Sequence, residues 1–315
     1  MGSILETILP VFGLIAAGTL AARTGFIGAA AAQGMGQFVF NMALPALLFR
    51  SMALMEPQSL GLVSLWLAYF GSISIVWIAA TILSRATPAL AGDGGASAAM
   101  AAAFGNVVML GLPLTLSHFG PEGALPVSLI ISVHAPILWL VAVLHLEAAR
   151  QRQVPSPLLL ARSLGLELLR NPIVLALVLG SLWRFTGLGL DPIIDKTLDL
   201  LGGAGVPAAL VALGLSLAGY SLKGQWGGIA ILIVLKMLML PLVVWVVAAK
   251  VMHLPQLWIE VAVLLAAMPT GANAYLFAQR YTAATPAVSG AIAVGTALAA
   301  LTASALLYLI DSGLL

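Results

Sequence analysis

Two apolar stretches of the sequence combine residues that interrupt helices with side chains that form hydrogen bonds. The residues are Gly105, Asn106, Gly111 and Pro113 in FGNVVMLGLPL, and Pro269, Thr270, Gly271 and Asn273 in MPTGANAY. Proline removes a backbone donor and clashes with the preceding helical turn, and glycine permits unwinding. Backbone groups left unpaired by such breaks are costly in hydrocarbon. If these stretches cross a membrane, we expect both to line a polar cavity, where the Asn106 and Asn273 amides can bind freed backbone groups or a ligand.

The composition is that of an integral membrane protein. Of the 315 residues, 62% are hydrophobic and 8% are charged, and the mean hydropathy is +1.11, whereas soluble domains are roughly 45–50% apolar and about 25% charged. The net charge of +2 comes from 13 basic and 11 acidic residues dispersed along the chain, which does not favour a nucleic-acid surface. The absence of cysteine excludes disulfides and thiol catalysis. No HExxH or GxSxG motif occurs, so we expect no enzyme, no cofactor and no metal site.

With about 20 residues needed for each crossing, the sequence predicts ten transmembrane helices. They span residues 4–23, 30–50, 60–83, 95–119, 123–147, 171–186, 197–221, 227–249, 257–280 and 285–310. The one sizeable polar connection, residues 150–170, divides the chain in half. We therefore expect a first five-helix repeat in residues 1–147, a linker in 148–170 and a second repeat in 171–315. The start MGSILETILP has no basic residue before the first apolar run, which favours a spanning helix over a cleaved signal peptide.

Lysine and arginine residues in the connections predict the orientation. Eight follow the odd-numbered helices: Arg23, Arg85, Arg150, Arg152, Arg162, Arg170, Lys223 and Arg280. Four lie on the opposite side: Arg50, Arg184, Lys196 and Lys250. The positive-inside rule therefore predicts a cytoplasmic linker and two extracytoplasmic termini.

The two halves resemble each other at an offset of 162 residues. Pro10, Gly18, Gly25 and Pro45 match Pro172, Gly180, Gly187 and Pro207. Chance agreement in a sequence rich in glycine and proline is the alternative explanation. The same offset matches the break in the fourth helix to the break in the ninth. Because five crossings are an odd number, the repeats must be inverted, and matched broken helices are typical of secondary transporters that bind substrate at the membrane midplane.

The breaks favour an anionic ligand. The N-terminus of a half-helix carries about half a positive charge, and neither break contains the Asp or Glu that a cation carrier would need. Lys236, within the eighth predicted helix, either adds positive charge to the site or is a snorkelling or packing residue. His134, within the fifth, either has a proton-linked or ligand role or makes a structural hydrogen bond.

Four segments in order resemble the auxin efflux carrier family, whose bacterial members include malonate and other organic-acid permeases. They are ILPVFGLIAAGTLAARTGFI, FVFNMALPALLF, FGNVVMLGLPL and MPTGANAYLFAQRY. The resemblance implies that broken helices 4 and 9 cross, that scaffold helices 1, 2, 6 and 7 form a homodimer, and that helices 3–5 and 8–10 move as an elevator. It implies that Asn106, Pro113, Pro269 and Asn273 lie at the crossover, with Asn41 and Pro45 on the scaffold face beside the substrate. The long cytoplasmic loop of the plant auxin carriers is absent here.

These features predict an all-α secondary transporter of the bacterial inner membrane that moves a small carboxylate, such as malonate or an auxin-like acid, by alternating access. The expected substrate-binding residues are Asn41, Gly105, Asn106, Pro113, Pro269, Thr270 and Asn273. A sodium-coupled symporter of the bile acid type is one alternative, and it would need an acidic cation site, for which Glu260 is a remote candidate. A sensor or membrane enzyme is another, and it would bind a ligand or do chemistry without flux.

Overall fold

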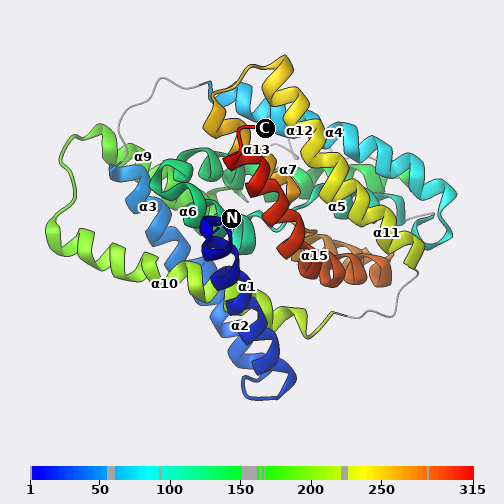
Figure 1. Ribbon diagram of the computed structural model, residues 1–315, viewed down its shortest axis with the longest axis horizontal. Helices are drawn as coiled ribbons and strands as arrows, with labels where there is room; N and C mark the ends of the chain where they lie inside the picture. The colour runs from blue at the N-terminus through cyan, green and yellow to red at the C-terminus, as the bar shows by residue number, and fades with distance from the viewer. Residues whose placement is uncertain are drawn as a thin grey trace.

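The computed structural model describes residues 2–54, 61–91, 94–150, 162, 165–166, 168–220, 226–281 and 284–315. Helices make up nearly all of this described part (Figure 1). The first half contains α1 (Gly2–Arg23), α2 (Ala29–Phe38), η1 (Val39–Ala43), α3 (Leu44–Leu54), α4 (Leu62–Ala86), η2 (Pro88–Leu90), α5 (Gly94–Ala103), η3 (Val107–Gly111), α6 (Leu112–Phe119), η4 (Gly120–Gly123) and α7 (Ala124–Ala149). The second half contains α9 (Pro172–Phe185), α10 (Pro192–Leu217), α11 (Trp226–Val234), η5 (Leu235–Met239), α12 (Leu240–Trp245), η6 (Val246–Val251), α13 (Gln256–Ala267), α14 (Ala272–Tyr281) and α15 (Thr285–Asp311).

Seven of the described helices are long and apolar enough to cross a membrane. They are Ile4–Arg23, Ala29–Leu54, Leu62–Ala86, Val107–Ala149, Pro192–Leu217, Trp226–Val251 and Thr285–Asp311. Two shorter apolar helices, Pro172–Phe185 and Gln256–Ala267, accompany them. The chain is therefore an all-helical, multi-pass membrane protein, as its composition predicts.

Most of the predicted linker, including Arg152, lies outside the described residues, as does Lys223. The second predicted helix, residues 30–50, is longer than expected. The helical run begins at Ala29 and ends at Leu54.

Three short π-helical segments each end two residues before a proline. They are η1 before Pro45, η3 before Pro113 and η5 before Pro241. A proline ring clashes with the carbonyl four residues earlier and donates no amide hydrogen bond. A wider π-helical turn relieves this clash within a continuous helix. Proline thus accounts for these three irregular turns, whereas the π-helical segment η6 has no proline at this spacing.

The helices associate in two groups (Figure 1). In the first, α1, α2, α3, α9 and α10 pack mainly on one another, with α1 against α10 and α3 against α9 as the most extensive pairs. In the second, α4, α5 and α7 pack with α11–α15. Contacts between the groups are sparser. They join α1 to α6 and α15, α10 to η3 and α6, and α7 to α3 and α9.

Glycines permit the close approach of α1 and α10. A Cβ atom at Gly214 would collide with the backbone carbonyl of Ile15, and one at Gly18 would collide with that of Val211. The Thr19 hydroxyl also donates to the Gly214 carbonyl at 3.0 Å. The close approach of these two helices is therefore possible only with small residues at the crossing.

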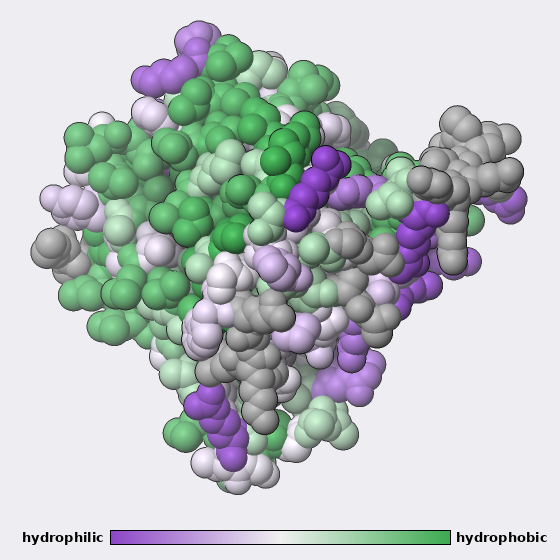
Figure 2. All heavy atoms as spheres, turned by 90° about the vertical axis from the view of Figure 1, so that its right-hand side faces the viewer, coloured by the Kyte–Doolittle hydropathy of each residue, from purple (hydrophilic) through white to green (hydrophobic). Residues whose placement is uncertain are grey.

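The outer surface is apolar over a broad area. Figure 2, which faces the side where α4 and α11 lie, shows apolar side chains over one part of this face and hydrophilic residues gathered elsewhere. Along α4 the exposed apolar side chains are Leu62, Val63, Leu67, Ile75, Ile78, Ile82 and Leu83. So large an exposed apolar surface is unfavourable in water and is suited to contact with lipid.

Candidate functional site

Two helix breaks meet inside the second group of helices. Helix α5 ends at Ala103 and η3 begins at Val107, while α13 ends at Ala267 and α14 begins at Ala272. The extended residues between them form an antiparallel bridge that pairs Gly105 with Thr270. The Asn106 N–H donates to the Pro269 carbonyl at 2.8 Å, and the Gly271 N–H donates to the Phe104 carbonyl at 2.9 Å. Each break therefore satisfies part of the other break's backbone.

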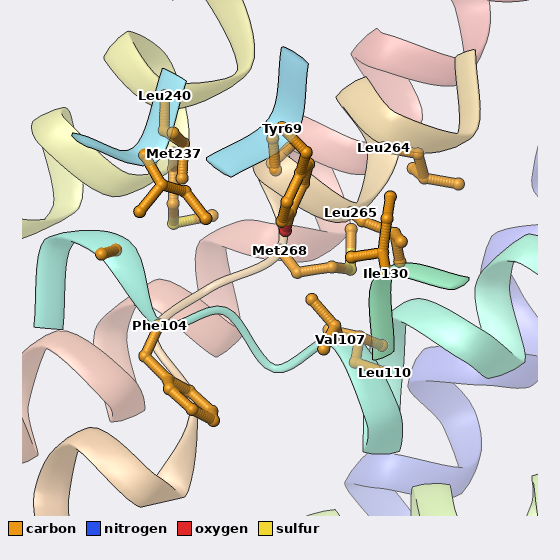
Figure 3. Close-up of a cluster of buried hydrophobic side chains, with 14 of the residues drawn as sticks. Tyr69, Phe104, Val107, Leu110, Ile130, Met237, Leu240, Leu264, Leu265 and Met268 are labelled. Carbon is orange, nitrogen blue, oxygen red and sulfur yellow. The ribbon is translucent and has the colours of Figure 1, made fainter. Parts of the chain in front are cut away.

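Side chains from four helices enclose this crossing. In Figure 3 the extended backbone after Phe104 passes close to that after Met268, with Tyr69 of α4, Ile130 of α7, Met237 of η5 and Leu265 of α13 around it. All six of these side chains are buried. The unwound backbone is thus held by a tightly packed apolar shell.

Gly271 is required by the closeness of the two backbones. A Cβ atom added there would lie 2.9 Å from the Gly105 carbonyl oxygen and 3.0 Å from Phe104 Cδ1. Real Cβ atoms essentially never approach a backbone oxygen this closely. The glycine that the sequence places in the second break therefore serves the pairing of the two segments.

Two polar side chains bind the C-terminal ends of the broken helices. The Thr270 hydroxyl donates to the Ala101 carbonyl of α5 at 2.9 Å. The Lys236 Nζ donates to the Ala266 carbonyl of α13 at 2.5 Å. The last carbonyls of a helix have no partner within it and carry a partial negative charge. Because C-termini as well as N-termini meet here, the field at the crossing is more balanced than the sequence alone indicates, and Lys236 adds positive charge to it.

A cavity of about 360 Å³ lies beside the crossing. Its polar lining residues are Asn106, His134, Asn171, Ser216 and Asn273. Backbone and apolar side chains complete it: Phe40, Phe104, Gly105, Val107, Val108, Met109, Ile131, Ala135, Ile173, Gly271, Ala272 and Leu276. The lining comes from both groups of helices, because Phe40 belongs to η1, Ile173 to α9 and Ser216 to α10.

Several hydrogen-bond donors of this cavity have no partner in the described part of the chain. The side-chain amides of Asn106 and Asn273 make no hydrogen bond there. The first N–H groups of η3 and α14 include those of Val107, Val108 and Ala272. They have no acceptor within their own helices, and the described loops supply none. Unpaired amides together with two positive helix ends are suited to binding an anion.

The predicted site residues separate into three sets. Gly105, Asn106, Asn273 and His134 line the cavity. Pro269, Thr270 and Lys236 hold the crossing together through the bonds described above. Asn41 and Pro113 are not among the lining residues: Asn41 is exposed in η1 next to the lining residue Phe40, and Pro113 is buried at the start of α6.

Sequence reasoning missed the contribution of the first group of helices to the cavity. Asn171 caps α9, its side-chain oxygen accepting from the Ile173 N–H at 2.9 Å, and Ser216 lies in the last turn of α10. An asparagine directly before Pro172 is a recognisable helix N-cap. Nothing in the local sequence, however, shows that this cap faces the crossing.

Among the described residues, no group of three or more His, Asp or Glu side chains could hold a metal ion. The polar lining is made of amides, a hydroxyl and an imidazole.

Comparison with known proteins places the chain among transporters. The family model described as "Membrane transport protein" matches residues 3–307. A protein of Rhizobium meliloti (strain 1021) named "Putative malonate transporter" is 28% identical over 100% of this chain and 98% of its own length. "Auxin efflux carrier component 8" of Arabidopsis thaliana is 24% identical over 65% of this chain and 68% of its own. "Lysosomal cholesterol signaling protein" of Mus musculus is 26% identical over 76% of this chain and 29% of its own length.

The family match spans nearly the whole sequence, including both breaks and the cavity residues. The chain therefore belongs to the membrane transport protein family, which is the auxin efflux carrier family.

Proposed function

We propose that this protein is a secondary transporter that carries a small organic anion, bound by its carboxylate in the cavity beside the crossing. The observation that carries the proposal is that two helix N-termini and the amides of Asn106 and Asn273 line one cavity without partners in the described residues. A carboxylate offers two oxygen atoms that accept several hydrogen bonds. Each bond to a charged group contributes about 1.5–3 kcal/mol, so a few of them account for specific binding.

The arrangement of helices supports a carrier with ten crossings. The long helical run Val107–Ala149 is interrupted by η4, which separates α6 from α7. Counting these separately and adding α9 and the broken pair α13–α14 gives the ten crossings of two inverted repeats. In this proposal α1, α2–α3, α9 and α10 form the scaffold that also dimerises, and the second group of helices carries the substrate.

Elevator movement is consistent with the contacts between the two groups. Contacts within each group are far more extensive than those between them, and the cavity is lined from both. Sliding of one group against the other would carry the cavity across the membrane and open it to each side in turn.

The cavity lies near the side predicted to be cytoplasmic. Asn171 precedes the first residue of α9 and Ser216 lies near the end of α10, and both positions adjoin connections that the positive-inside rule assigns to the cytoplasm. With this orientation and with both termini outside, we infer an inward-facing state of a bacterial inner-membrane carrier.

Malonate and auxin-like acids are the substrates to test first, because relatives carry the names of a malonate transporter and an auxin efflux carrier. The sodium-coupled alternative is less favoured: the residues lining the cavity include no Asp or Glu, and Glu260 bonds to the Gln256 side chain at 2.8 Å in the first turns of α13.

Proteoliposome counterflow tests the proposal. Purified protein should exchange internal unlabelled carboxylate for external labelled malonate or indole-3-acetate, at several pH values and with and without sodium. Flux of either probe that does not require sodium supports an anion carrier of this type. Saturable binding without any flux would favour a sensor, and an absolute need for sodium would favour the bile acid type of symport.

A further inference from the structure

We propose that His134 is a further substrate-contacting residue, whose imidazole donates a hydrogen bond to the carried anion from α7. The inference rests on the proposed function and adds a third element to the site, besides the helix ends at η3 and α14. His134 takes no part in the hydrogen bonds described above that hold the two breaks together.

His134 is buried in the wall of the cavity, and both of its ring nitrogens are closed to water. Its side chain is only 1% exposed, yet the residue lines the cavity beside the crossing. Within the described residues, neither Nδ1 nor Nε2 has a hydrogen-bond partner. The Gly105 backbone faces the ring, and Lys236 lies close enough to act on it electrostatically from behind that glycine.

The Gly105 backbone lies near the ring but forms no hydrogen bond with it. Its neighbours are aromatic: the ring centroid of Phe104 lies 4.7 Å away, that of Tyr69 6.0 Å and that of Phe70 6.3 Å. Buried polar groups in proteins are almost always hydrogen-bonded, and each exception calls for an explanation. A ligand in the cavity would supply the missing partner.

Other buried polar groups do not share this position. Side-chain atoms without a partner in the described part of the chain also occur in Tyr69, Ser97, Ser128, Trp245, Thr296 and Thr302. None of these six residues lines the cavity. Among the buried side chains described, that of His134 alone combines unpaired polar atoms with a place in the cavity lining.

The contact does not depend on the protonation state of the imidazole. The neutral ring carries one N–H and the protonated ring carries two, so either form donates at least one hydrogen bond. The acceptor is an oxygen of the carboxylate that the crossing binds, or an oxygen on a second polar group of the ligand. A monocarboxylate and a dicarboxylate distinguish these two cases, because only the dicarboxylate offers the second group.

The test compares variants of His134 with a control in the same helix in binding of malonate and indole-3-acetate to purified protein. His134→Leu removes both polar atoms, whereas His134→Gln keeps a donor and an acceptor. Ser128→Ala is the control, because its buried hydroxyl is also unpaired and lies in the same helix, α7, but outside the cavity lining. We expect His134→Leu to weaken binding of the wild-type ligand about tenfold or more, His134→Gln to retain it within about threefold, and Ser128→Ala to leave it unchanged.

Asn106→Ala separates failure of this inference from failure of the proposed function. Unchanged binding by His134→Leu with weakened binding by Asn106→Ala would overturn the role of His134 alone. Unchanged binding by both, or no binding of either probe by the wild-type protein, would overturn the proposed site as well. If His134→Leu does not fold, NMR of wild-type protein with ¹⁵N-labelled histidine replaces the binding measurement on that variant. The His134 resonance is assigned by its absence from the spectrum of His134→Gln. A shift on adding the bound probe supports the contact, and an unchanged resonance at saturation overturns it.

Discussion

The backbone N–H of Asn106 donates to the carbonyl of Pro269 at 2.8 Å, joining a break in the first half of the chain to one in the second. The reciprocal bond from Gly271 to Phe104 closes an antiparallel pair around Gly105 and Thr270. Backbone pairing of this kind satisfies donors that lipid could not satisfy. It also holds the side chains of Asn106 and Asn273 on segments whose relative position is fixed.

Replacing either asparagine at the crossing should weaken anion binding. Asn106→Ala and Asn273→Ala each remove an unpaired amide from the cavity lining, and a lost hydrogen bond to a charged ligand costs about 1.5–3 kcal/mol, or roughly tenfold to a hundredfold in Kd. Asn106→Asp, nearly isosteric, should weaken binding further because it places a negative charge beside the ligand. Calorimetric titration measures all three. Gln256→Ala, at the surface, is the control, and wild-type affinity in all three cavity variants would exclude these side chains from the site.

Gly271→Ala should disrupt the crossing. The new Cβ atom would lie 2.9 Å from a backbone oxygen that cannot move without breaking the bridge. Overpacking of this kind costs about 1–3 kcal/mol or more. We expect a lower melting temperature in detergent and loss of flux. Gly227→Ala is the matched control, because a Cβ atom at Gly227 meets nothing within 4 Å; equal stability of the two variants would contradict the close backbone approach.

Lys236→Met should reduce affinity for the anion. The Lys236 Nζ lies behind Gly105, where an added Cβ atom would be 3.2 Å from it, and Gly105 lines the cavity. The positive charge of the protonated amine attracts an anion more strongly in this dry site than it would in water, so we expect Kd to rise tenfold or more. Lys250→Met, which removes a lysine over the Trp245 ring, should leave Kd unchanged. If both variants bind as the wild type does, the role of Lys236 is confined to its bond with Ala266.

Gly214→Ala should separate α1 from α10. Alanine is favoured over glycine within a helix by roughly 0.5–1 kcal/mol, but the added methyl group would collide with the Ile15 carbonyl and overpacking costs about 1–3 kcal/mol. The steric cost should prevail and lower the melting temperature. Gly203→Ala, in the same helix and with nothing within 4 Å, should keep or raise it. A stabilised Gly214→Ala variant would contradict the observed packing of α1 on α10.

The part of the site that could be predicted from the sequence consists of features set by neighbouring residues, namely the two helix breaks and the amides beside them. Gly105, Gly271, Pro113 and Pro269 identify the two breaks because glycine and proline alter a helix wherever they occur. Asn106 and Asn273 follow as cavity residues because they are the amides nearest to those breaks. Thr270 was expected to bind substrate, and the structure shows its hydroxyl on the Ala101 carbonyl, a partner from the other half of the chain that no local pattern indicates.

The sequence by itself determined that the protein is an all-helical membrane protein of a transporter family and where its helices are interrupted, because hydropathy and the backbone limits of glycine and proline act within one or two turns. The tertiary structure decided which groups are free to bind. It paired Thr270 and Lys236 with helix carbonyls, and it left Asn106, Asn273 and His134 at one cavity that Asn171 and Ser216 complete from other helices. The physical reason is that a polar group buried from water bonds to whatever packing brings within about 3 Å of it, and that neighbour is set by contacts between helices distant in the chain.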